Sequence, residues 1–394
     1  MNITIVGGGF GGVKTALELA KDKNNSITLI TDNPEFQYYP ALYGTATGYS
    51  HLQSWVALEV IFEHTKNVTV EIDTITTINK SAHELVGKSG RTYTYETLVL
   101  SLGAVTTYFG IAGLDEFAYG IKSASEIMRL KKHLHEELVK DRELDKHYVV
   151  VGAGPTGIEL SAALVTYLEN LRKYYKLNDQ KIVIDLVEAA PRVLPKMKEA
   201  TSAKVLKRLT KLGINVELGK SVESETADSL LVSGVPISSH TVIWTSGVAN
   251  NPFYKANPDQ FTLAKNGKVE VDEYLRADKD VYVIGDNAAT AFSGLAQTAL
   301  HDALYVSRAI TAFKNGATPK PYVAKLPPVV VPVGEGWAVF EWKFIRLSGW
   351  IASLIRSAAD FVGYSDILPF GQALGVWHSQ RVKDDDYYKL SSDD

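Results

Sequence analysis

The 394-residue sequence contains no cysteine, and this absence excludes several kinds of chemistry. Without thiols there is no disulfide framework, no thiolate-bound zinc or iron–sulfur cluster, and no cysteine nucleophile or redox dithiol. An excess of positive charge is also lacking, since 41 Lys and Arg stand against 45 Asp and Glu. Nucleic-acid-binding domains are normally strongly basic, so this balance argues against nucleic acid as a partner. We predict no metal site.

Long apolar runs are missing as well. The longer uncharged stretches are polar or are broken by Gly and Pro, so none is typical of a membrane-spanning helix. The chain starts almost at once with a predicted strand at Ile3–Val6 instead of the basic segment, apolar run and cleavage site of a signal peptide. We therefore expect a protein on the cytoplasmic side, with two or three domains for its length.

Strand and helix patterns alternate along most of the chain and follow the same order twice. The first series has a strand at Ile3–Val6, a glycine turn and a helix over about Val13–Lys21. The second has a strand at His147–Val151, a glycine turn and a helix over Ile158–Tyr175. Two such units predict an α/β protein with two Rossmann-like dinucleotide-binding domains. We expect residues 1–112 and 249–325 to form the first domain, 113–248 the second, and 326–394 a separate C-terminal region.

Both glycine turns match the pattern G-x-G-x-x-G between a strand and a helix. The first glycine permits the tight turn, the second lets a pyrophosphate approach the backbone, and the third allows close helix–strand packing. The N-terminus of the following helix offers free N–H groups and a positive dipole end to the phosphates. The glycines are Gly7, Gly9 and Gly12 in the first turn, and Gly152, Gly154 and Gly157 in the second.

An acidic residue at the end of the second strand of each unit would bind a ribose diol. In the second unit the strand Ile182–Val187 leads to Glu188, which favours NADH over NADPH because a carboxylate repels a 2′-phosphate. Arg192 lies nearby and leaves NADPH open as an alternative. In the first unit the corresponding position falls on Thr31 or Asp32. With two turns in one chain, one nucleotide stays bound and the other arrives as substrate, and a flavin is the usual hydride acceptor.

Several segments of the sequence resemble the type II NADH dehydrogenases, the single-chain NADH:quinone oxidoreductases of the flavoprotein superfamily with two dinucleotide folds. The more specific matches are Pro155-Thr156-Gly157-x-Glu159-Leu160 and Trp244-Thr245-x-Gly247-Val248. Together with residues 5–12, 98–103, 187–195 and 283–286, they extend the resemblance over most of the chain.

The resemblance implies that the first fold binds FAD noncovalently and that the second binds NADH as substrate. Two electrons would then pass to a membrane quinone without proton pumping. Asp286 would contact the ribitol or phosphate region of the flavin, and Glu159 would lie near the nicotinamide and take part in quinone reduction. The cofactor-binding residues expected from the turns and the resemblance are Gly7, Gly9, Phe10, Gly11, Gly12, Thr31, Asp32, Gly103, Gly152, Gly154, Pro155, Thr156, Gly157, Glu188, Gly247, Gly285, Asp286, Ala296 and Gln297.

One segment departs from the family pattern. The Ala296-Gln297 pair matches the part of the family that runs past the flavin toward the quinone, but two adjacent glutamines that usually follow are replaced by His301 and Asp302. A histidine titrates near neutral pH, so this pair could give a proton to a reduced quinone. Alternatively, both residues lie on the polar face of a helix. The candidate catalytic residues are Glu159, Gln297 and His301.

The C-terminal region contains apolar residues at helical spacing, with polar residues between them. Such a pattern is typical of an amphipathic helix on a membrane surface. A dimer interface or a helix that covers the core would give the same pattern. The sequence ends in an acidic tail from Asp384 that we expect to be disordered. The apolar residues are Trp350, Ile351, Leu354, Ile355, Ala358, Phe361 and Val362.

These observations predict a peripheral membrane flavoenzyme of the respiratory chain on the cytoplasmic face of the cell membrane. Two other functions fit the same turns: a soluble NADH-dependent reductase of a small redox protein, and a nucleotide-binding flavoprotein with a sensor or structural role. The segment 31–40 is also similar to sulfide:quinone oxidoreductases, but their chemistry needs cysteines that this chain lacks.

Overall fold

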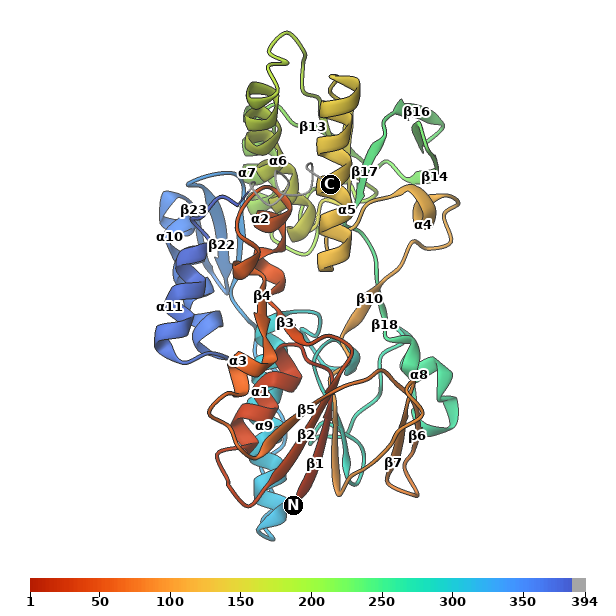
Figure 1. Cartoon of the computed structure of the whole chain (residues 1–394), viewed down its shortest axis with the longest axis vertical. Coiled ribbons are helices and arrows are strands. Elements are labelled where there is room, and N and C mark those ends of the chain that lie inside the picture. The colour runs from red at the N-terminus through yellow and green to blue at the C-terminus, as the bar shows by residue number, and fades with distance from the viewer. Residues whose placement is uncertain (385–394) are drawn as a thin grey trace.

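The computed structural model describes residues 1–384, apart from the side chains of Lys140 and Asp141. Except for Asp384, the acidic tail that we expect to be disordered lies outside the described residues. Two parallel sheets form the body of the molecule and lie at opposite ends of its long axis (Figure 1). The predicted α/β architecture with two dinucleotide-binding folds is confirmed.

The first unit is built on a six-stranded sheet in which only the β19–β20 pair is antiparallel. Its central strands are apolar and buried, as expected for strands covered on both faces. Helices α1 (Phe10–Leu19) and α9 (Ala296–Lys314) pack against each other on one face. The strands in spatial order are β19 (Arg276–Asp278), β20 (Val281–Val283), β9 (Thr97–Leu100), β1 (Asn2–Val6), β2 (Ser26–Thr31) and β5 (Val68–Ile72).

Helix α1 begins three residues before the Val13 predicted from the apolar pattern. Gly9 is its N-cap with extended backbone, so Phe10, Gly11 and Gly12 are already helical and buried. The glycines lie inside the first turn because that turn must pack closely on the sheet. The helix therefore starts directly at the glycine turn and directs its N–H groups toward the open side of the turn.

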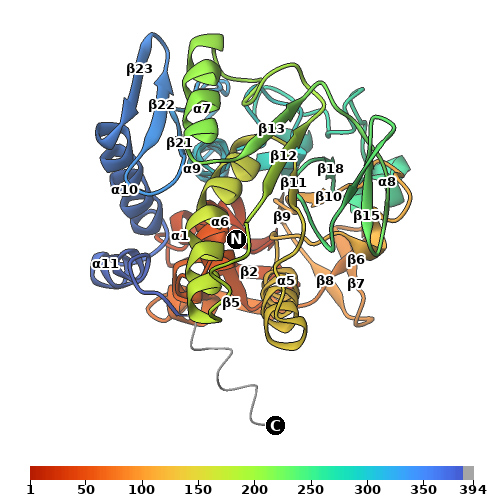
Figure 2. The same cartoon turned by 90° about the horizontal axis from the view of Figure 1, so that it is seen from above.

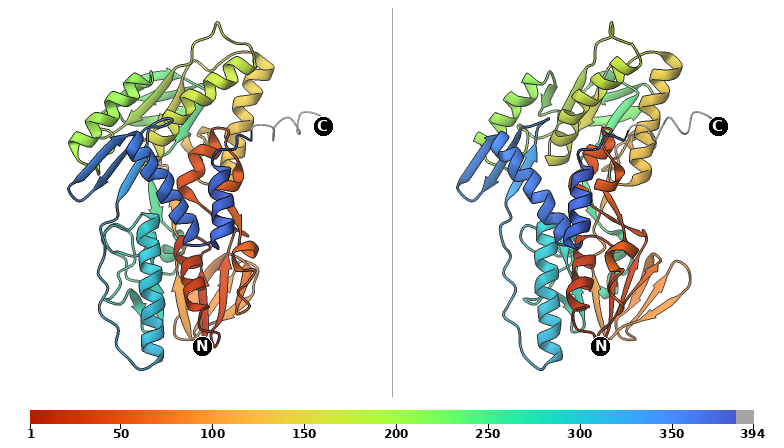
Figure 3. Two further views of the ribbon diagram at one scale, coloured as in Figure 1. Left: turned by 90° about the vertical axis from the view of Figure 1, so that its left-hand side faces the viewer. Right: turned by 60° about the vertical axis from the view of Figure 1, so that its left-hand side comes forward.

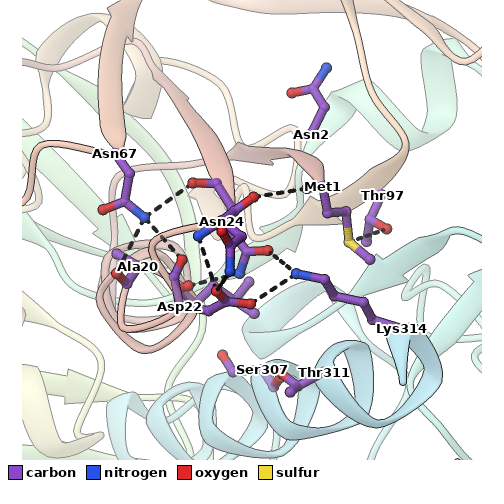
Figure 4. Close-up of polar contacts among 12 residues, drawn as sticks. Met1, Asn2, Ala20, Asp22, Asn24, Asn67, Thr97, Ser307, Thr311 and Lys314 are labelled. Atoms are coloured by element: carbon purple, nitrogen blue, oxygen red, sulfur yellow. Dashed lines mark hydrogen bonds and ion pairs between the residues drawn. The ribbon is translucent and has the colours of Figure 1, made fainter. Parts of the chain in front are cut away.

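The far end of the first unit is held by polar contacts between segments that are distant in sequence (Figure 4). Lys314 at the end of α9 donates to Asp22 at 2.8 Å and to Asn25 at 2.9 Å. The Asn67 amide donates to the carbonyl oxygens of Ala20, Asp22 and Asn25. These bonds satisfy carbonyl groups after helix α1 and fix α9 beside it.

The second unit contains a four-stranded, fully parallel sheet. Helix α6 (Pro155–Tyr174) follows its glycine turn, but it begins three residues before the predicted Ile158, as α1 does before Val13. Helices α5 (Ala124–Glu136) and α7 (Glu199–Lys211) complete the layer structure. Ser123 and Glu126 form a capping box that starts α5. The strands in spatial order are β13 (Asn215–Leu218), β12 (Ile184–Glu188), β11 (Tyr148–Val151) and β17 (Thr241–Trp244).

Two antiparallel strands, β10 (Ala104–Thr106) and β18 (Val248–Asn250), carry the chain between the two units. The fully buried Asn287 fastens this connection to the first unit. Its amide nitrogen donates to Gly103 O at 2.8 Å and to Asn250 Oδ1 at 2.7 Å, and its oxygen accepts from Gly103 N at 2.9 Å. Both crossing segments are thus tied to the turn that contains Asp286.

The remaining elements are short pieces attached to the two units. Two antiparallel three-stranded sheets, β6–β8 and β14–β16, and one two-stranded sheet, β3–β4, lie outside the main sheets. Their bounds, with those of the short helices, are β3 (Glu35–Gln37), α2 (Leu42–Ala46), β4 (Trp55–Ala57), α3 (Leu58–Phe62), β6 (Ile75–Asn79), β7 (Glu84–Gly87), β8 (Thr92–Thr94), α4 (Leu114–Phe117), β14 (Val222–Thr226), β15 (Ser229–Val232), β16 (Val235–Ser238) and α8 (Pro252–Ala256).

The C-terminal region forms an antiparallel sheet followed by two helices, which lie on one side of the molecule (Figures 2 and 3). The predicted amphipathic helix is α10 (Trp350–Ser365), and α11 (Phe370–Ser379) packs against it. The stretch before α10, which contains Trp337, Phe340, Trp342 and Phe344, forms two of the three strands. The strands are β21 (Val329–Pro332), β22 (Ala338–Trp342) and β23 (Ile345–Gly349).

Candidate functional site

The first glycine turn is closed on its protein side and open toward the ligand side. A Cβ atom on Gly7 would lie 2.3 Å from Ser101 O, and one on Gly12 would lie 1.9 Å from Gly7 O. A Cβ on Gly9 would meet nothing within 4 Å. Gly7 and Gly12 are thus required by packing, while the space above Gly9 is free for a pyrophosphate. The turn fits a bound dinucleotide.

The second turn has the same geometry. A Cβ on Gly152 would lie 2.1 Å from Ser246 Oγ, and one on Gly157 would lie 1.8 Å from Gly152 O. Gly154 again has open space around it, and Pro155 and Thr156 begin helix α6 there. Two turns of identical construction therefore offer a phosphate site at a helix N-terminus in each unit.

The structure separates the two candidates for the ribose-binding residue of the first unit. Thr31 is buried below the turn, where its hydroxyl bonds the backbone of Asn33. A Cβ on Gly8 would lie 2.6 Å from Thr31 Oγ1. Asp32 is exposed at the end of β2. Of these two residues Asp32 is the accessible one, so we predict that its carboxylate contacts the ribose.

Asp286 follows β20 in a short 3₁₀ turn, Gly285–Asn287. Burial raises the pKa of its carboxyl group, and the nearby Lys268 and Lys122 partly oppose this shift. The turn is held from behind, because Gly285 N donates to Asp302 Oδ2 at 3.0 Å and Tyr322 donates to Asp302 Oδ1 at 2.5 Å. Asp286 thus lies at the carboxyl edge of the sheet, where a flavin ribitol or phosphate group would be held.

Asp302 is fully buried in helix α9, so the expectation that it shares a polar face with His301 is wrong. Its carboxylate supports the Gly285 turn and does not face solvent. His301 is half-buried, and its Nε2 lies 3.1 Å from Val323 O. Both residues therefore connect α9 to the segment that follows it, while Gln297 and Ala296 lie in the first turn of α9. The proposed proton donation by His301 stays a prediction.

Gly103 and Gly247 flank the β10–β18 connection, and both have positive φ, 70° and 73°. A Cβ on Gly247 would lie 2.6 Å from Thr107 O and 2.7 Å from the Phe109 ring. The Lys122 ammonium lies 3.4 Å from Gly247 O, and burial lowers its pKa. These glycines allow the close backbone approach that joins the two units next to the dinucleotide turns.

Glu188 ends strand β12 beside the second glycine turn, as predicted. Its two carboxylate oxygens accept from Ala153 N at 2.6 Å and from Ala190 N at 2.8 Å. Arg192 is engaged elsewhere, since its guanidinium donates to Met197 O at 2.6 Å and to Ser202 Oγ at 2.8 Å. The Glu188 carboxylate is thus oriented by the backbone, and the nearby Arg192 is held by other partners.

We expect kcat/KM for NADH to exceed that for NADPH by tenfold or more. The Glu188 carboxylate would accept hydrogen bonds from a ribose diol and would repel a 2′-phosphate. Replacing Glu188 with Ala should reduce the ratio of the two kcat/KM values, mainly by weakening the binding of NADH. Steady-state kinetics with both nucleotides measure the effect, and Glu217→Ala on the neighbouring strand serves as the control. A native preference for NADPH would contradict this assignment.

Sequence reasoning missed Arg356, which lies beside Glu159 although the two are 197 positions apart. Arg356 Nη1 is 3.0 Å from Glu159 Oε1, and Arg356 Nε is 2.9 Å from Asp360 Oδ2. Its Nη2 donates to Pro40 O at 2.5 Å, and Tyr38 donates to Asp360 Oδ1 at 3.1 Å. This group thus joins α6, α10 and the first unit. The one signal in the sequence was the i, i+4 pair of Arg356 and Asp360 within an apolar helix.

Burial raises the pKa of Glu159 to about 7, and the charge of Arg356 opposes this shift. A carboxyl group with such a pKa can hold or release a proton at neutral pH. Glu159, Arg356 and Asp360 lie on the wall of a cavity of about 410 Å³, which Tyr43, Asn170 and Gln380 also line. The volume is in the range of small-molecule sites. Glu159 is therefore the one predicted catalytic residue that lines this cavity.

Comparison with known proteins agrees with this geometry. Residues 1–309 match the family model of pyridine nucleotide-disulphide oxidoreductases. The type II NADH:quinone oxidoreductase Ndh of Mycobacterium tuberculosis is 30% identical over 90% of this chain and 82% of its own length. The structure of NDH2 from Plasmodium falciparum in complex with NADH has a TM-score of 0.85 at 18% identity, covering 96% of this chain and 97% of that one.

A sulfide:quinone oxidoreductase from Aquifex aeolicus has the same fold, with a TM-score of 0.78 at 18% identity over 91% of this chain and 89% of that one. The chain belongs to the pyridine nucleotide-disulphide oxidoreductase family and, within it, to the type II NADH:quinone oxidoreductases.

Proposed function

We propose that this chain is a peripheral membrane NADH:quinone oxidoreductase whose quinone site is the cavity beside Glu159. FAD, when bound at the Gly7–Gly12 turn and Asp286, supplies a carrier that accepts hydride from NADH and releases electrons one or two at a time. The second glycine turn and Glu188 would hold NADH. The observation that carries the proposal is the buried group of Glu159, Arg356 and Asp360 at a cavity between the two units and the C-terminal helix.

The residues that line the cavity can supply a proton and stabilise a charge during quinone reduction. Glu159, with a pKa of about 7, can give a proton to a quinone oxygen in the cavity. Arg356 then stabilises the carboxylate that remains, while Asp360 and the carbonyl oxygen of Pro40 fix its guanidinium. Ala162 and Ala163 of α6 also line the cavity.

An apolar surface lies next to this site. On α10, Trp350 is 67% exposed and Leu354 is 60% exposed, while Phe370 on α11 is 71% exposed. Phe344, between β22 and β23, is 82% exposed. Apolar side chains exposed to this extent are typical of a membrane or protein contact. We propose that it rests on the cytoplasmic face of the membrane and leads quinone toward the cavity.

Within residues 1–384, no helix combines the length and hydropathy that a bilayer crossing needs. We propose an interfacial contact, through the exposed apolar face of α10 and α11. A homodimer that covers the same surface is the alternative. Vesicle binding at protein concentrations where sedimentation gives a monomer would distinguish the two.

The decisive experiment is anaerobic reduction of the purified protein by NADH, followed by reoxidation with a panel of quinones. We expect FAD in the supernatant after heat denaturation, rapid bleaching of the flavin by NADH, and reoxidation by a quinone at a rate that sustains turnover. A protein that NADH reduces but that no quinone reoxidises would overturn the proposed acceptor.

We also expect quinone reduction to slow as the pH rises through about 7. The protonated fraction of Glu159 falls over this range, since burial raises its pKa from about 4.5 to about 7. Replacing Glu159 with Gln should lower the rate of quinone reduction about 100-fold or more and remove this pH dependence. Stopped-flow reoxidation from pH 5.5 to 9 measures it, and flavin reduction by NADH in the same variant is the control. An unchanged pH profile in Glu159→Gln would assign the proton to another group.

A further inference from the structure

The β22–β23 hairpin lies beside helix α7 of the second unit and packs on helix α10 (Figures 2 and 3). Trp342 pairs with Ile345 across the two strands, so the turn consists of Lys343 and Phe344 alone. Phe344 at the tip is 82% exposed, and Trp342 and Ile345 are exposed on either side of the turn. The part of the chain that the structure describes thus leaves three large apolar side chains uncovered at this tip.

Lysines of the second unit lie against this hairpin. Lys198, which precedes α7, donates from its ammonium group to Lys343 O at 3.0 Å, although 145 positions separate the two residues. Lys204 Nζ of α7 lies 3.5 Å from Ser348 Oγ on β23. All three lysines are exposed, and within residues 1–384 no acidic side chain forms an ion pair with them. The tertiary structure therefore gathers three accessible positive charges from two distant parts of the chain.

Arg346 adds a fourth exposed cation on the α7 side of the hairpin. It pairs across the strands with Glu341, and directly opposed side chains lie on the same face of a sheet. That face is turned toward α7, because the Glu341 carboxylate accepts from Thr201 Oγ1 at 2.6 Å and from Lys198 N at 3.3 Å. Glu199, in the first turn of α7, is the other acidic residue next to these lysines. Four cations thus stand against two carboxylates, one of which is already hydrogen-bonded.

We propose that the hairpin tip and these four cations bind a membrane surface rich in anionic lipid, with Phe344 among the lipids and the cations on headgroup phosphates. The inference rests on the proposed membrane function and names its lipid partner. Charge complementarity carries it, because the patch is positive and the cytoplasmic leaflet is negative. Lysine and arginine beside an apolar residue suit this boundary, since their stems pack on apolar groups while their charges stay in water. The second unit thus docks through α7, in addition to the contact of α10 and α11.

Vesicle binding of the full chain with its FAD tests the lipid partner. At about 50 mM KCl, the affinity for vesicles with about 30% phosphatidylglycerol should exceed that for pure phosphatidylcholine at least tenfold. The excess should vanish at about 1 M KCl, where the Debye length falls to about 3 Å. Binding to the neutral vesicles reports the apolar contact of α10 and α11, so its loss would contradict the proposed membrane function. Equal binding to both kinds of vesicle would overturn only the present inference.

Removing charge from the patch identifies the residues. Each lysine near an anionic surface strengthens binding about fivefold, so Lys204→Gln combined with Lys343→Gln should weaken binding to the anionic vesicles about 25-fold. Binding to neutral vesicles and reduction of a water-soluble quinone should not change. Lys66→Gln combined with Lys88→Gln is the matched control, because it removes the same charge at exposed positions of the first unit. An equal loss of binding in both double variants would overturn the proposal.

A fluorescent label at the tip gives an independent readout, because the native sequence has no thiol that would react with it. A polarity-sensitive probe on Phe344→Cys should shift to shorter wavelength and become several-fold less accessible to iodide when anionic vesicles are added. The same probe on Val86→Cys, exposed on β7 of the first unit, should not change. Unchanged quenching at the tip of a vesicle-bound protein would contradict the proposal. So would binding of soluble polyglutamate through Lys204 and Lys343 without vesicle binding, because the patch would then suit an acidic protein.

Discussion

Replacing Arg356 with Ala is expected to lower the unfolding free energy of the holoenzyme by about 3–5 kcal/mol at pH 8. The substitution leaves the Glu159 and Asp360 carboxylates buried without their shared cation, and breaking a buried ion pair on one side has this cost. The loss should be smaller at pH 5, because an unpaired buried carboxyl group has a raised pKa and is then neutral. Denaturant unfolding of the FAD-loaded protein at both pH values measures the effect.

The conservative change Arg356→Lys separates charge from geometry. Lysine retains the positive charge but cannot bond Glu159, Asp360 and Pro40 with one planar group, so we expect an intermediate loss of stability. Quinone reduction should fall tenfold or more in both variants. Flavin reduction by NADH should change little, because the dinucleotide turns are untouched. A stability change below 1 kcal/mol in Arg356→Ala would show that water replaces the guanidinium.

Placing a charge on the apolar surface is expected to release the protein from membranes. Leu354→Glu should weaken vesicle binding at least tenfold, because a charged residue at the interface costs on the order of 1–3 kcal/mol, depending on depth. Reduction of hydrophobic quinones in vesicles should fall in parallel, while NADH-driven flavin reduction stays intact. Thr92→Glu, which adds the same charge on the exposed strand β8, is the control. Full quinone reduction by a Leu354→Glu protein that no longer binds vesicles would refute a membrane role for α10.

Deleting the C-terminal region from Trp337 onward would not test the membrane contact as Leu354→Glu does. Val339 of β22 is fully buried in the core cluster that surrounds α6, and the deletion also removes Arg356. Both losses would disturb Glu159 and the second unit, so lost quinone reduction would not report on membrane contact. The point substitution changes only the exposed face.

The dinucleotide turns could be read from the sequence because their requirements are local. A positive φ at Gly7 and Gly152, and the absence of a Cβ where helix and strand touch, follow from a few neighbouring residues. Glu188 was predictable for the same reason, since it ends a strand whose apolar pattern is continuous. The helix boundary at Phe10 was missed only because the glycines that start α1 are themselves helical.

Tertiary structure alone decided how α10 is oriented. Its inward-facing line is Ala352, Arg356, Asp360 and Tyr364, with the Arg356 side chain 11% exposed, whereas the apolar residues Trp350, Leu354 and Val362 face outward. Periodicity reveals that a helix has two faces, but a polar face packs inward only if distant partners neutralise it. Those partners are Glu159, Tyr38 and the Pro40 carbonyl oxygen, from two other parts of the chain. The burial of Asp302 and the engagement of Arg192 likewise depend on partners that the local sequence does not specify.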